Sequence, residues 1–201
     1  MSRWSPAPEP AQEAATAPPP SRPVLFLDRD GVLLVEKDYL SDPAAVELEH
    51  GVPAALRDAR AAGFLLICVS NQSGLGRGRF TAADFEAVMA RFADLLQGAG
   101  CPLDAYYYCP HAPGAGCLCR KPAPGLLAEA AAHFRWDPAR AWMIGDKISD
   151  VDFALGAGLR PVLVLTGYGH EQARRLGDRR GVAVAADLAA AVRLILAEVR
   201  A

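Results

Sequence analysis

Four aspartates stand at the ends of two short apolar segments, where a catalytic site is expected in a protein of alternating strands and helices. Asp28 and Asp30 follow the first apolar segment, and Asp146 and Asp150 follow the fourth. A single aspartate in such a place is ordinarily the N-cap of the next helix. Four carboxylates in one small site would repel one another unless a cation neutralises them. Because an all-oxygen set of ligands suits Mg²⁺, these aspartates predict a magnesium site.

A second group of polar residues has the types that bind phosphate. The segment 70–74, SNQSG, directly follows an apolar run and offers hydroxyl, amide and backbone N–H donors, and such turns hold phosphate well. Arg120 and Lys121 would balance the charge of a phosphoryl group, although a neighbouring basic pair is by itself more typical of a solvated surface. The residues expected to contact a phosphorylated substrate are Ser70, Asn71, Gln72, Arg120, Lys121 and Lys147.

Three cysteines and a histidine form a separate pattern just before this basic pair. Cys109 and His111 are two residues apart, as are Cys117 and Cys119, with a short Pro/Gly-rich loop between the two pairs. Four soft ligands at this spacing suit one tetrahedral Zn²⁺ in a closed, structural site. The alternative is free thiols with a surface histidine; a disulfide between Cys117 and Cys119 is disfavoured by its geometry. A zinc site here would fix the loop that carries Arg120 and Lys121.

The elements that must position these side chains alternate along the chain. We expect strands over 24–28, 64–70, 105–109, 141–146, 161–165 and 182–187, and helices over 51–63, 81–100, 124–134, 150–157 and 187–199. This alternation, with strands that read as continuous apolar runs, predicts an α/β fold with a mainly parallel sheet. Ligands of such sheets bind at the carboxyl ends of the strands, which is where the polar residues above are found.

Chain length and composition predict one folded domain behind a tail. The chain has 201 residues, so we expect a single domain over 24–201. Residues 1–23 are rich in proline, alanine and glutamate, a composition that predicts a disordered tail; a docking peptide is the alternative. This segment lacks the apolar stretch of a signal peptide. We therefore expect a cytoplasmic protein with reduced cysteines.

The charge balance narrows the partners. With 21 Lys and Arg against 23 Asp and Glu, the formal net charge is −2. Proteins that bind nucleic acid or a membrane surface usually carry a basic face, so we expect neither partner, and a zinc-loop nucleic-acid module is disfavoured. No apolar run approaches the length of a membrane span. A small phosphorylated metabolite is the expected partner, and short loops on one domain suggest a monomer.

Four short motifs in this order resemble the haloacid dehalogenase (HAD) superfamily. They are DRDGV (28–32), SNQSG (70–74), Lys121 and GDKISD (145–150), and each follows an expected strand. The resemblance spans about residues 24–186. It implies a three-layer HAD-like (Rossmannoid) fold with a central, mainly parallel sheet, no large cap domain and a short zinc-binding loop.

The resemblance also implies a role for each motif. Asp28 would be the nucleophile of a phosphatase and would form an aspartyl-phosphate, while Asp30 would protonate the leaving oxygen and then activate water. Ser70 and Lys121 would hold the phosphoryl oxygens. Mg²⁺ would be bound by Asp28, the backbone carbonyl of Asp30, and Asp146. Asp150 would act on the metal either directly or through water.

The cysteine and histidine loop resembles one branch of the superfamily, the zinc-loop phosphatases. Members of this branch act on heptose 1,7-bisphosphate or on histidinol phosphate, and the resemblance favours the heptose bisphosphate. A bisphosphate requires positive charge beyond the reacting phosphate, which Arg77, Arg79 and Arg120 would supply; Arg77 and Arg79 are equally typical of exposed surface. A non-catalytic protein on the same scaffold is the alternative from another class, and intact acids in the first motif argue against it. A polynucleotide 3′-phosphatase would need a nucleic-acid groove, of which the charge gives no sign.

Overall fold

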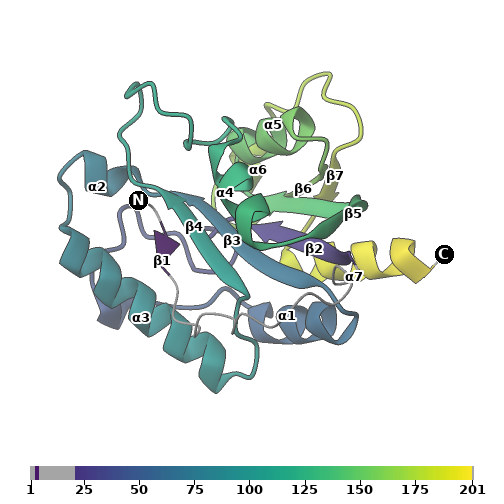
Figure 1. The fold of residues 1–201 in the computed structure, drawn as a ribbon, viewed down its shortest axis with the longest axis horizontal. Coiled ribbons are helices and arrows are strands. Elements are labelled where there is room, and N and C mark those ends of the chain that lie inside the picture. The colour runs from purple at the N-terminus through teal and green to yellow at the C-terminus, as the bar shows by residue number, and fades with distance from the viewer. Residues whose placement is uncertain (1–2, 5–20, 201) are drawn as a thin grey trace.

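A computed structural model describes residues 3–4 and 21–200, and its centre is a seven-stranded sheet in the order β1-β4-β3-β2-β5-β6-β7 (Figure 1). All neighbouring strands are parallel except the first pair, in which β1 runs antiparallel to β4. The strands are β1 (Arg3–Trp4), β2 (Arg22–Leu27), β3 (Leu65–Asn71), β4 (Ala105–Cys109), β5 (Trp136–Gly145), β6 (Arg160–Val164) and β7 (Ala183–Ala185). The prediction of a mainly parallel α/β sheet is confirmed.

Helices cover both faces of this sheet and make three layers (Figure 1). One face carries α1 (Val52–Ala61), α3 (Ala82–Gly98) and α7 (Leu188–Arg200), and the other carries α4 (Gly125–His133) and α5 (Ile148–Gly156). Three short elements lie in the connections: η1 (Pro43–Ala45), α2 (Ser73–Gly76) and α6 (Gly169–Ala173). The helices predicted from periodicity all form, with ends within a few residues of those expected.

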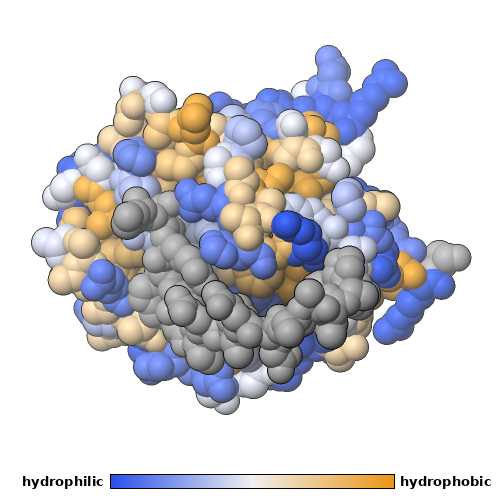
Figure 2. All heavy atoms as spheres, in the orientation of Figure 1, coloured by the Kyte–Doolittle hydropathy of each residue, from blue (hydrophilic) through white to orange (hydrophobic). Residues whose placement is uncertain are grey.

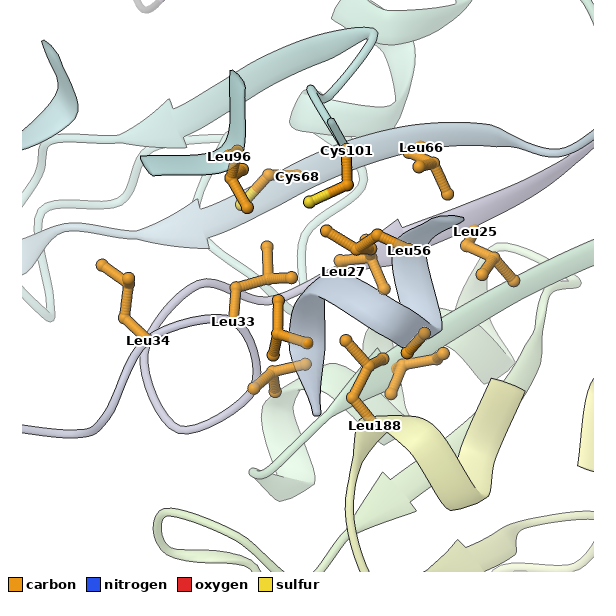
Figure 3. Close-up of a cluster of buried hydrophobic side chains, with 14 of the residues drawn as sticks. Leu25, Leu27, Leu33, Leu34, Leu56, Leu66, Cys68, Leu96, Cys101 and Leu188 are labelled. Carbon is orange, nitrogen blue, oxygen red and sulfur yellow. The ribbon is translucent and has the colours of Figure 1, made fainter. Parts of the chain in front are cut away.

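The alternation of side chains along β2 explains why helices pack on both faces. Leu25 and Leu27 lie in the core under α1, α3 and α7, whereas Val24 and Phe26 lie in the core under α4 and α5. All four side chains are fully buried, because successive residues of a strand point to opposite faces. Figure 3 shows Leu25 and Leu27 among leucines from neighbouring elements, with Cys68 and Cys101 in the same cluster.

Local capping sets where the longest helix begins. The Thr81 side chain accepts a hydrogen bond from the Asp84 backbone N–H, and the Asp84 side chain accepts one from Thr81. This reciprocal capping box satisfies two donors that the first turn leaves unpaired. The predicted cap at Thr81 is therefore confirmed, and it sets the first residue of α3 after the loop that follows β3.

Some elements differ from the sequence expectation. β5 begins at Trp136, five residues before the predicted strand, and α2, α6 and β1 were not predicted. The tail predicted over 1–23 lies mostly outside the described residues. Of that segment, the structure describes Arg3–Trp4, which pairs with Tyr106 and Tyr107, and residues 21–23, where β2 already begins.

The connections leave no room for a cap domain within the described part of the chain. A loop, η1 and α1 join β2 to β3, and α2 and α3 join β3 to β4, so the absence of a large cap is confirmed for residues 21–200. None of the helices in this range has the length and apolar character needed to cross a bilayer. The face seen in Figure 2 mixes polar and apolar residues.

Candidate active site

The carboxyl ends of three adjacent strands bring the predicted residues together. β2 lies between β3 and β5, so Asp28 follows the central strand, with Ser70 on one side and Asp146 on the other. Ligand sites of parallel sheets form where the connections diverge to opposite sides in this way. A cavity of about 190 Å³ opens there.

Three carboxylates form a buried cluster at the floor of this site. Each of Asp28, Asp146 and Asp150 has a carboxylate oxygen within 4.8 Å of the others, and all three are buried. Burial raises the pKa of Asp146 to about 7, against the attraction of Lys147, and Asp28 and Asp150 raise it further. Burial also raises the pKa of Asp150. The cluster thus has more negative charge than its surroundings stabilise, as expected of a cation site.

Lys121 is the buried cation of the cluster. Its Nζ lies 3.1 Å from Asp28 Oδ1 and 2.7 Å from Asp150 Oδ1, and it donates to the Val69 carbonyl at 2.6 Å. Burial would lower the pKa of Lys121, but Asp150 and Asp28 outweigh burial and raise it. In return, Lys121 and Lys147 overcome the effect of burial on Asp28 and hold its pKa below the usual value. Asp28 is therefore ionised, as a nucleophile must be.

Asn71 holds Lys121 in this place. Its side-chain amide donates to the Lys121 carbonyl at 3.0 Å and accepts from the Lys121 N–H at 2.9 Å. A primary amide that pairs in this way with a backbone group fixes the neighbouring chain as a strand partner would. The Asn71 side chain is thus committed to the loop, and its predicted contact with substrate stays a prediction.

A second hydrogen-bonded group surrounds the other aspartate of the first motif. Arg29 donates to both carboxylate oxygens of Asp30, at 2.9 Å each. Gln72 donates to Asp30 Oδ2 and to Ser70 Oγ, at 2.8 Å each, and accepts from Arg29 at 2.9 Å. Arg29 was not among the predicted site residues; the signal that could have found it is its place between Asp28 and Asp30 in the first motif.

Glycines allow the loops to approach the carboxylates closely. A Cβ on Gly31 or on Gly167 would lie 2.4 Å from Asp146 Oδ2, and both residues have a positive φ, of 79° and 53°. Any other residue type would therefore clash and be strained. The Tyr168 N–H donates to Asp146 Oδ2 at 2.9 Å, which fixes that oxygen and leaves Oδ1 beside Lys147 at 3.0 Å.

The rim of the cavity adds residues that the sequence analysis missed. The additional lining residues are Arg29, Glu36, Asp38, Tyr39, Leu40, Ser73, Phe80, Ser149 and Tyr168. Asp38 and Tyr39 both have a positive φ, of 42° and 65°, a strained conformation for residues other than glycine. No sequence pattern marks such a loop, because its conformation depends on what packs against it.

Most of the predicted substrate residues meet at this cavity. Those that line it are Asp28, Asp30, Ser70, Asn71, Gln72, Arg120, Lys121, Lys147 and Asp150. Arg77 does not line it: it caps the end of α2. Arg79 lies over the Tyr39 ring, 5.6 Å from its centroid. Lys147 contacts Asp146 and, at 3.4 Å, Glu36, so it joins the carboxylate floor to the rim.

Arg120 offers a donor that the described residues leave without a partner. Its Nη1 is buried and has no hydrogen-bond partner among them, although the residue lines the cavity. Leaving a buried charged donor unpaired is costly. An anionic ligand in the cavity would satisfy it.

The cysteine–histidine loop, residues 109–119, forms a compact group of four possible ligands. The Cys109 and Cys117 sulfurs are 3.6 Å apart, and His111 Nδ1 lies 3.6 Å from Cys109 Sγ and 3.2 Å from Cys119 Sγ. Ligands of a tetrahedral Zn²⁺ with Zn–S bonds of about 2.3 Å are roughly 3.7 Å apart. Burial and the adjoining thiols raise the pKa of Cys119 to about 12. The group therefore has the spacing and the crowding of a metal site.

Two helices hold this loop against the active site. A Cβ on Gly76 of α2 would lie 2.4 Å from the Ala112 backbone nitrogen, and one on Gly125 of α4 would lie 2.4 Å from the Leu118 carbonyl. Backbone therefore packs directly on backbone at both places. Cys119 is followed at once by Arg120 and Lys121, so the position of the loop determines where these two cations reach.

Comparison with known proteins gives consistent matches. The HAD-hydrolase-like family matches residues 118–191. D-glycero-beta-D-manno-heptose-1,7-bisphosphate 7-phosphatase of Escherichia coli K12 is 40% identical over 155 residues, covering 73% of this chain and 81% of the relative. The protein of the same name from Pseudomonas putida is 38% identical over 178 residues, covering 86% of this chain and 99% of the relative.

A solved structure extends the likeness to the fold. The D,D-heptose 1,7-bisphosphate phosphatase from B. bronchiseptica, complexed with magnesium and phosphate, superposes with a TM-score of 0.82. It is 34% identical and covers 88% of this chain and 99% of its own.

Proposed function

The chain belongs to the HAD-like phosphatases, and from this premise we propose that it removes the 7-phosphate of D-glycero-D-manno-heptose 1,7-bisphosphate. The observation that carries the proposal is the pairing of two cationic positions in one cavity. Lys121 lies beside the nucleophile Asp28, and the buried Nη1 of Arg120 has no partner among the described residues. A bisphosphate offers one phosphoryl group to each position.

The carboxylate floor fits Mg²⁺. Mg²⁺ prefers one or two carboxylates with water and substrate oxygens, and the three buried acids here lie within reach of one ion. Asp28, the backbone carbonyl of Asp30, and Asp146 would hold it. Both Asp150 oxygens already meet Lys121 or the Lys147 N–H, so Asp150 would act through water. Bound there, the ion would neutralise charge on the phosphoryl oxygens.

The first chemical step takes place on Asp28. A carboxylate oxygen attacks the phosphorus, and the bond from phosphorus to the sugar oxygen breaks, with the electron pair leaving on that oxygen. Asp30 donates a proton to the oxygen, so the sugar departs as an alcohol. Lys121 and Ser70 hold the phosphoryl oxygens in line, since phosphoryl transfer depends mainly on positioning and charge stabilisation.

The second step restores the enzyme. Asp30, now a carboxylate, takes a proton from water as the water oxygen attacks the phosphorus of the aspartyl-phosphate. The bond between phosphorus and Asp28 breaks, and inorganic phosphate leaves. The two steps together consume one water and one phosphomonoester and yield one alcohol and one phosphate.

The cysteine–histidine loop fits Zn²⁺ in a structural role. Its ligands Cys109, His111, Cys117 and Cys119 fill all four positions of a tetrahedron, and a closed site of this kind leaves no position for substrate. The ion would stiffen the loop that delivers Arg120 and Lys121.

Histidinol phosphate is the second candidate substrate. Glu36 and Asp38 line the cavity, and carboxylates there would accept the ammonium group that a histidinol carries. The two candidates therefore differ in which part of the rim they use.

Phosphate release from the two substrates in Mg²⁺ separates these candidates, with Asp28→Asn protein as the blank. We expect a higher kcat/KM for the heptose bisphosphate, by at least tenfold, which corresponds to about 1.4 kcal/mol of transition-state binding. Arg120→Met should remove most of that preference. Equal or greater activity on histidinol phosphate would reject the heptose assignment, and undiminished activity in Asp28→Asn would reject the nucleophile.

A further inference from the structure

Arg29 is a buried arginine that the reaction scheme does not use. Its side chain is 1% exposed, and it lies between the two aspartates of the first motif. A buried guanidinium is stable only when its donors and its charge find partners. The Arg29 guanidinium contacts Asp30 and Gln72 on one side and residues of α3 on the other. Arg29 therefore links the active site to the core.

The partners form a closed ring around the Asp30 carboxylate. Arg29 Nε donates to Oδ1, and Arg29 Nη2 donates to Oδ2. Gln72 Nε2 donates to the same Oδ2, while Gln72 Oε1 accepts from Arg29 Nη2. We name Arg29 and Gln72 the Asp30 cradle. A two-pronged pairing of a guanidinium with a carboxylate fixes direction as well as distance.

The far side of the cradle is anchored in α3. Arg29 Nη1 lies 3.7 Å from Met89 Sδ, and the guanidinium carbon lies 5.9 Å from the centroid of the Phe85 ring. Met89 and Phe85 are themselves buried in the core. The guanidinium therefore cannot shift without disturbing packed side chains. The carboxylate it holds is 18% exposed and lines the cavity.

The same ring reaches the phosphate site. Gln72 Nε2 also donates to Ser70 Oγ at 2.8 Å, so one amide group touches the proton donor and the hydroxyl proposed to hold the phosphoryl group. The distance between those two groups is thereby fixed. A proton donor acts only when it lies within hydrogen-bond reach of the leaving oxygen.

We propose that Arg29 and Gln72 are positioning residues that aim the Asp30 carboxyl group at the leaving oxygen of the substrate. The proposal deepens the proposed function, because it rests on Asp30 as the proton donor. Arg29 acts through Asp30. Gln72 acts through Asp30 and also holds the Ser70 hydroxyl, an effect common to both substrates that cancels in a ratio of the two. In the first step, their effect through Asp30 must therefore appear where the leaving group needs a proton and vanish where it does not. The second step, in which Asp30 activates water, is common to all substrates.

The leaving group distinguishes this role from a structural one. A sugar or histidinol alkoxide is a strong base and needs a proton as it leaves, whereas p-nitrophenolate is a weak base and leaves without one. General acid catalysis contributes about 10²–10⁴-fold where it operates. The measured quantity is the ratio of kcat/KM on the alkyl phosphate to kcat/KM on p-nitrophenyl phosphate, because kcat/KM reports the step in which the leaving group departs and not the later hydrolysis of the aspartyl-phosphate.

The test compares Arg29→Met, Arg29→Lys, Gln72→Met and Asp30→Asn, alone and combined, in the full-length enzyme with Mg²⁺. We expect Arg29→Met to lower the ratio by about 100-fold, and Arg29→Lys, which keeps one charged donor, to lower it less. In the Asp30→Asn background, Arg29→Met should change the ratio by less than about threefold, since the two changes act on one step. Slower hydrolysis of the aspartyl-phosphate would lower kcat and KM together and leave this ratio unchanged.

Arg22→Met is the matched control. Arg22 is at the opposite end of β2, where its side chain donates to the Gly63 and Phe64 carbonyls at 3.0 and 3.1 Å. Losing it should lower the melting temperature and leave the ratio as in wild type. If Arg29→Met fails to fold, Gln72→Met carries the test, since it removes an uncharged partner of Asp30.

Each outcome has one meaning. An equal loss of kcat/KM on both substrates in the Arg29 and Gln72 variants, or a loss in the ratio that multiplies with that of Asp30→Asn, shows a structural role and overturns the positioning proposal. An unchanged ratio in Asp30→Asn itself shows that Asp30 is not the proton donor, so the proposed mechanism fails first. A changed ratio in Asp30→Asn with unchanged ratios in the other variants rejects the positioning proposal alone.

Discussion

At the scale of single residues, the site contains positive and negative side chains that are largely buried and partly neutralise one another. Lys121 contacts Asp28 and Asp150, and Lys147 contacts Asp146. These two lysines leave the three buried carboxylates with one net negative charge. Asp146 shows the imbalance, because its pKa is raised to about 7 by burial first and by the other acids in addition. A divalent cation is the partner that such a group lacks.

The raised pKa of Asp146 predicts how Mg²⁺ binding depends on pH. A proton competes with the metal for this carboxylate below pH 7, so the Mg²⁺ affinity should fall about tenfold per pH unit there. Isothermal calorimetry at pH 6 and pH 8 measures this, and Asp146→Asn should bind weakly at both. An affinity that is equal at both pH values in the wild type would contradict the assignment of Asp146 as a ligand.

In the presence of a chelator, the raised pKa of Asp146 also makes the free energy of unfolding depend on pH. The folded protein binds this proton more tightly than the unfolded chain, whose carboxyl titrates near pH 3.8. The stabilisation that this proton gives the folded protein is therefore complete below about pH 4 and is lost as the pH rises through 7. Between pH 5 and 8, Mg²⁺ should accordingly raise the melting temperature more at the higher pH.

At the scale of elements, the cysteine–histidine loop acts as a clamp between two helices. It packs backbone to backbone on α2 through Gly76 and on α4 through Gly125. The Gln72 N–H also donates to the Cys109 carbonyl at 2.8 Å. The loop thus ties the end of β4 to the turn after β3, and a change in the loop should reach the phosphate site.

Replacing one proposed zinc ligand tests this element. Cys109→Ser should reduce bound zinc from about one atom per chain to near zero, and should lower the melting temperature more than it lowers kcat on p-nitrophenyl phosphate. Elemental analysis and thermal unfolding measure both. Cys101→Ala, at a buried cysteine outside the loop, is the control and should keep its zinc. Cys109→Ser protein that is metal-free yet as stable as wild type would refute the structural role.

At the scale of the whole molecule, the sheet supplies the rigid base that the loops require. β2 is central, is fully buried over Val24–Leu27, and ends directly at Asp28. Site geometry is held best when it is built on such an element. The core on both faces of β2 should therefore determine global stability, separately from the chemistry at its end.

A pair of leucines separates these contributions. Leu25 is fully buried in the core, whereas Leu155 on α5 is 41% exposed. Leu25→Ala should lower the free energy of unfolding by about 2–5 kcal/mol, and Leu155→Ala by about 0.5 kcal/mol or less. Urea titration measures both, and KM should remain as in wild type for each. A loss of similar size at the two positions would show that the core does not lie where the structure has it.

The order of strands and helices and the site motifs were accessible from sequence for a local reason. Apolar runs and helical periodicity are properties of neighbouring residues, and α3 even shows its start in the Thr81 and Asp84 pair. Asp28, Ser70, Lys121 and Asp146 were found because each follows an apolar run or a recognisable motif. Short elements such as α2 and β1 lack enough residues to give a periodic signal.

The sequence by itself determined the fold class, and it predicted the reacting carboxylates and the four loop ligands, since each depends on residue type and spacing. Only the tertiary structure decided what these side chains contact. It put Gln72 against Arg29 and Asp30, placed the Asn71 amide against the Lys121 backbone, and left Arg77 outside the cavity. The physical reason is that such pairings form between residues about 40 to 50 positions apart in the chain. Which partners meet is set by the order of strands in the sheet, and no local pattern encodes that order.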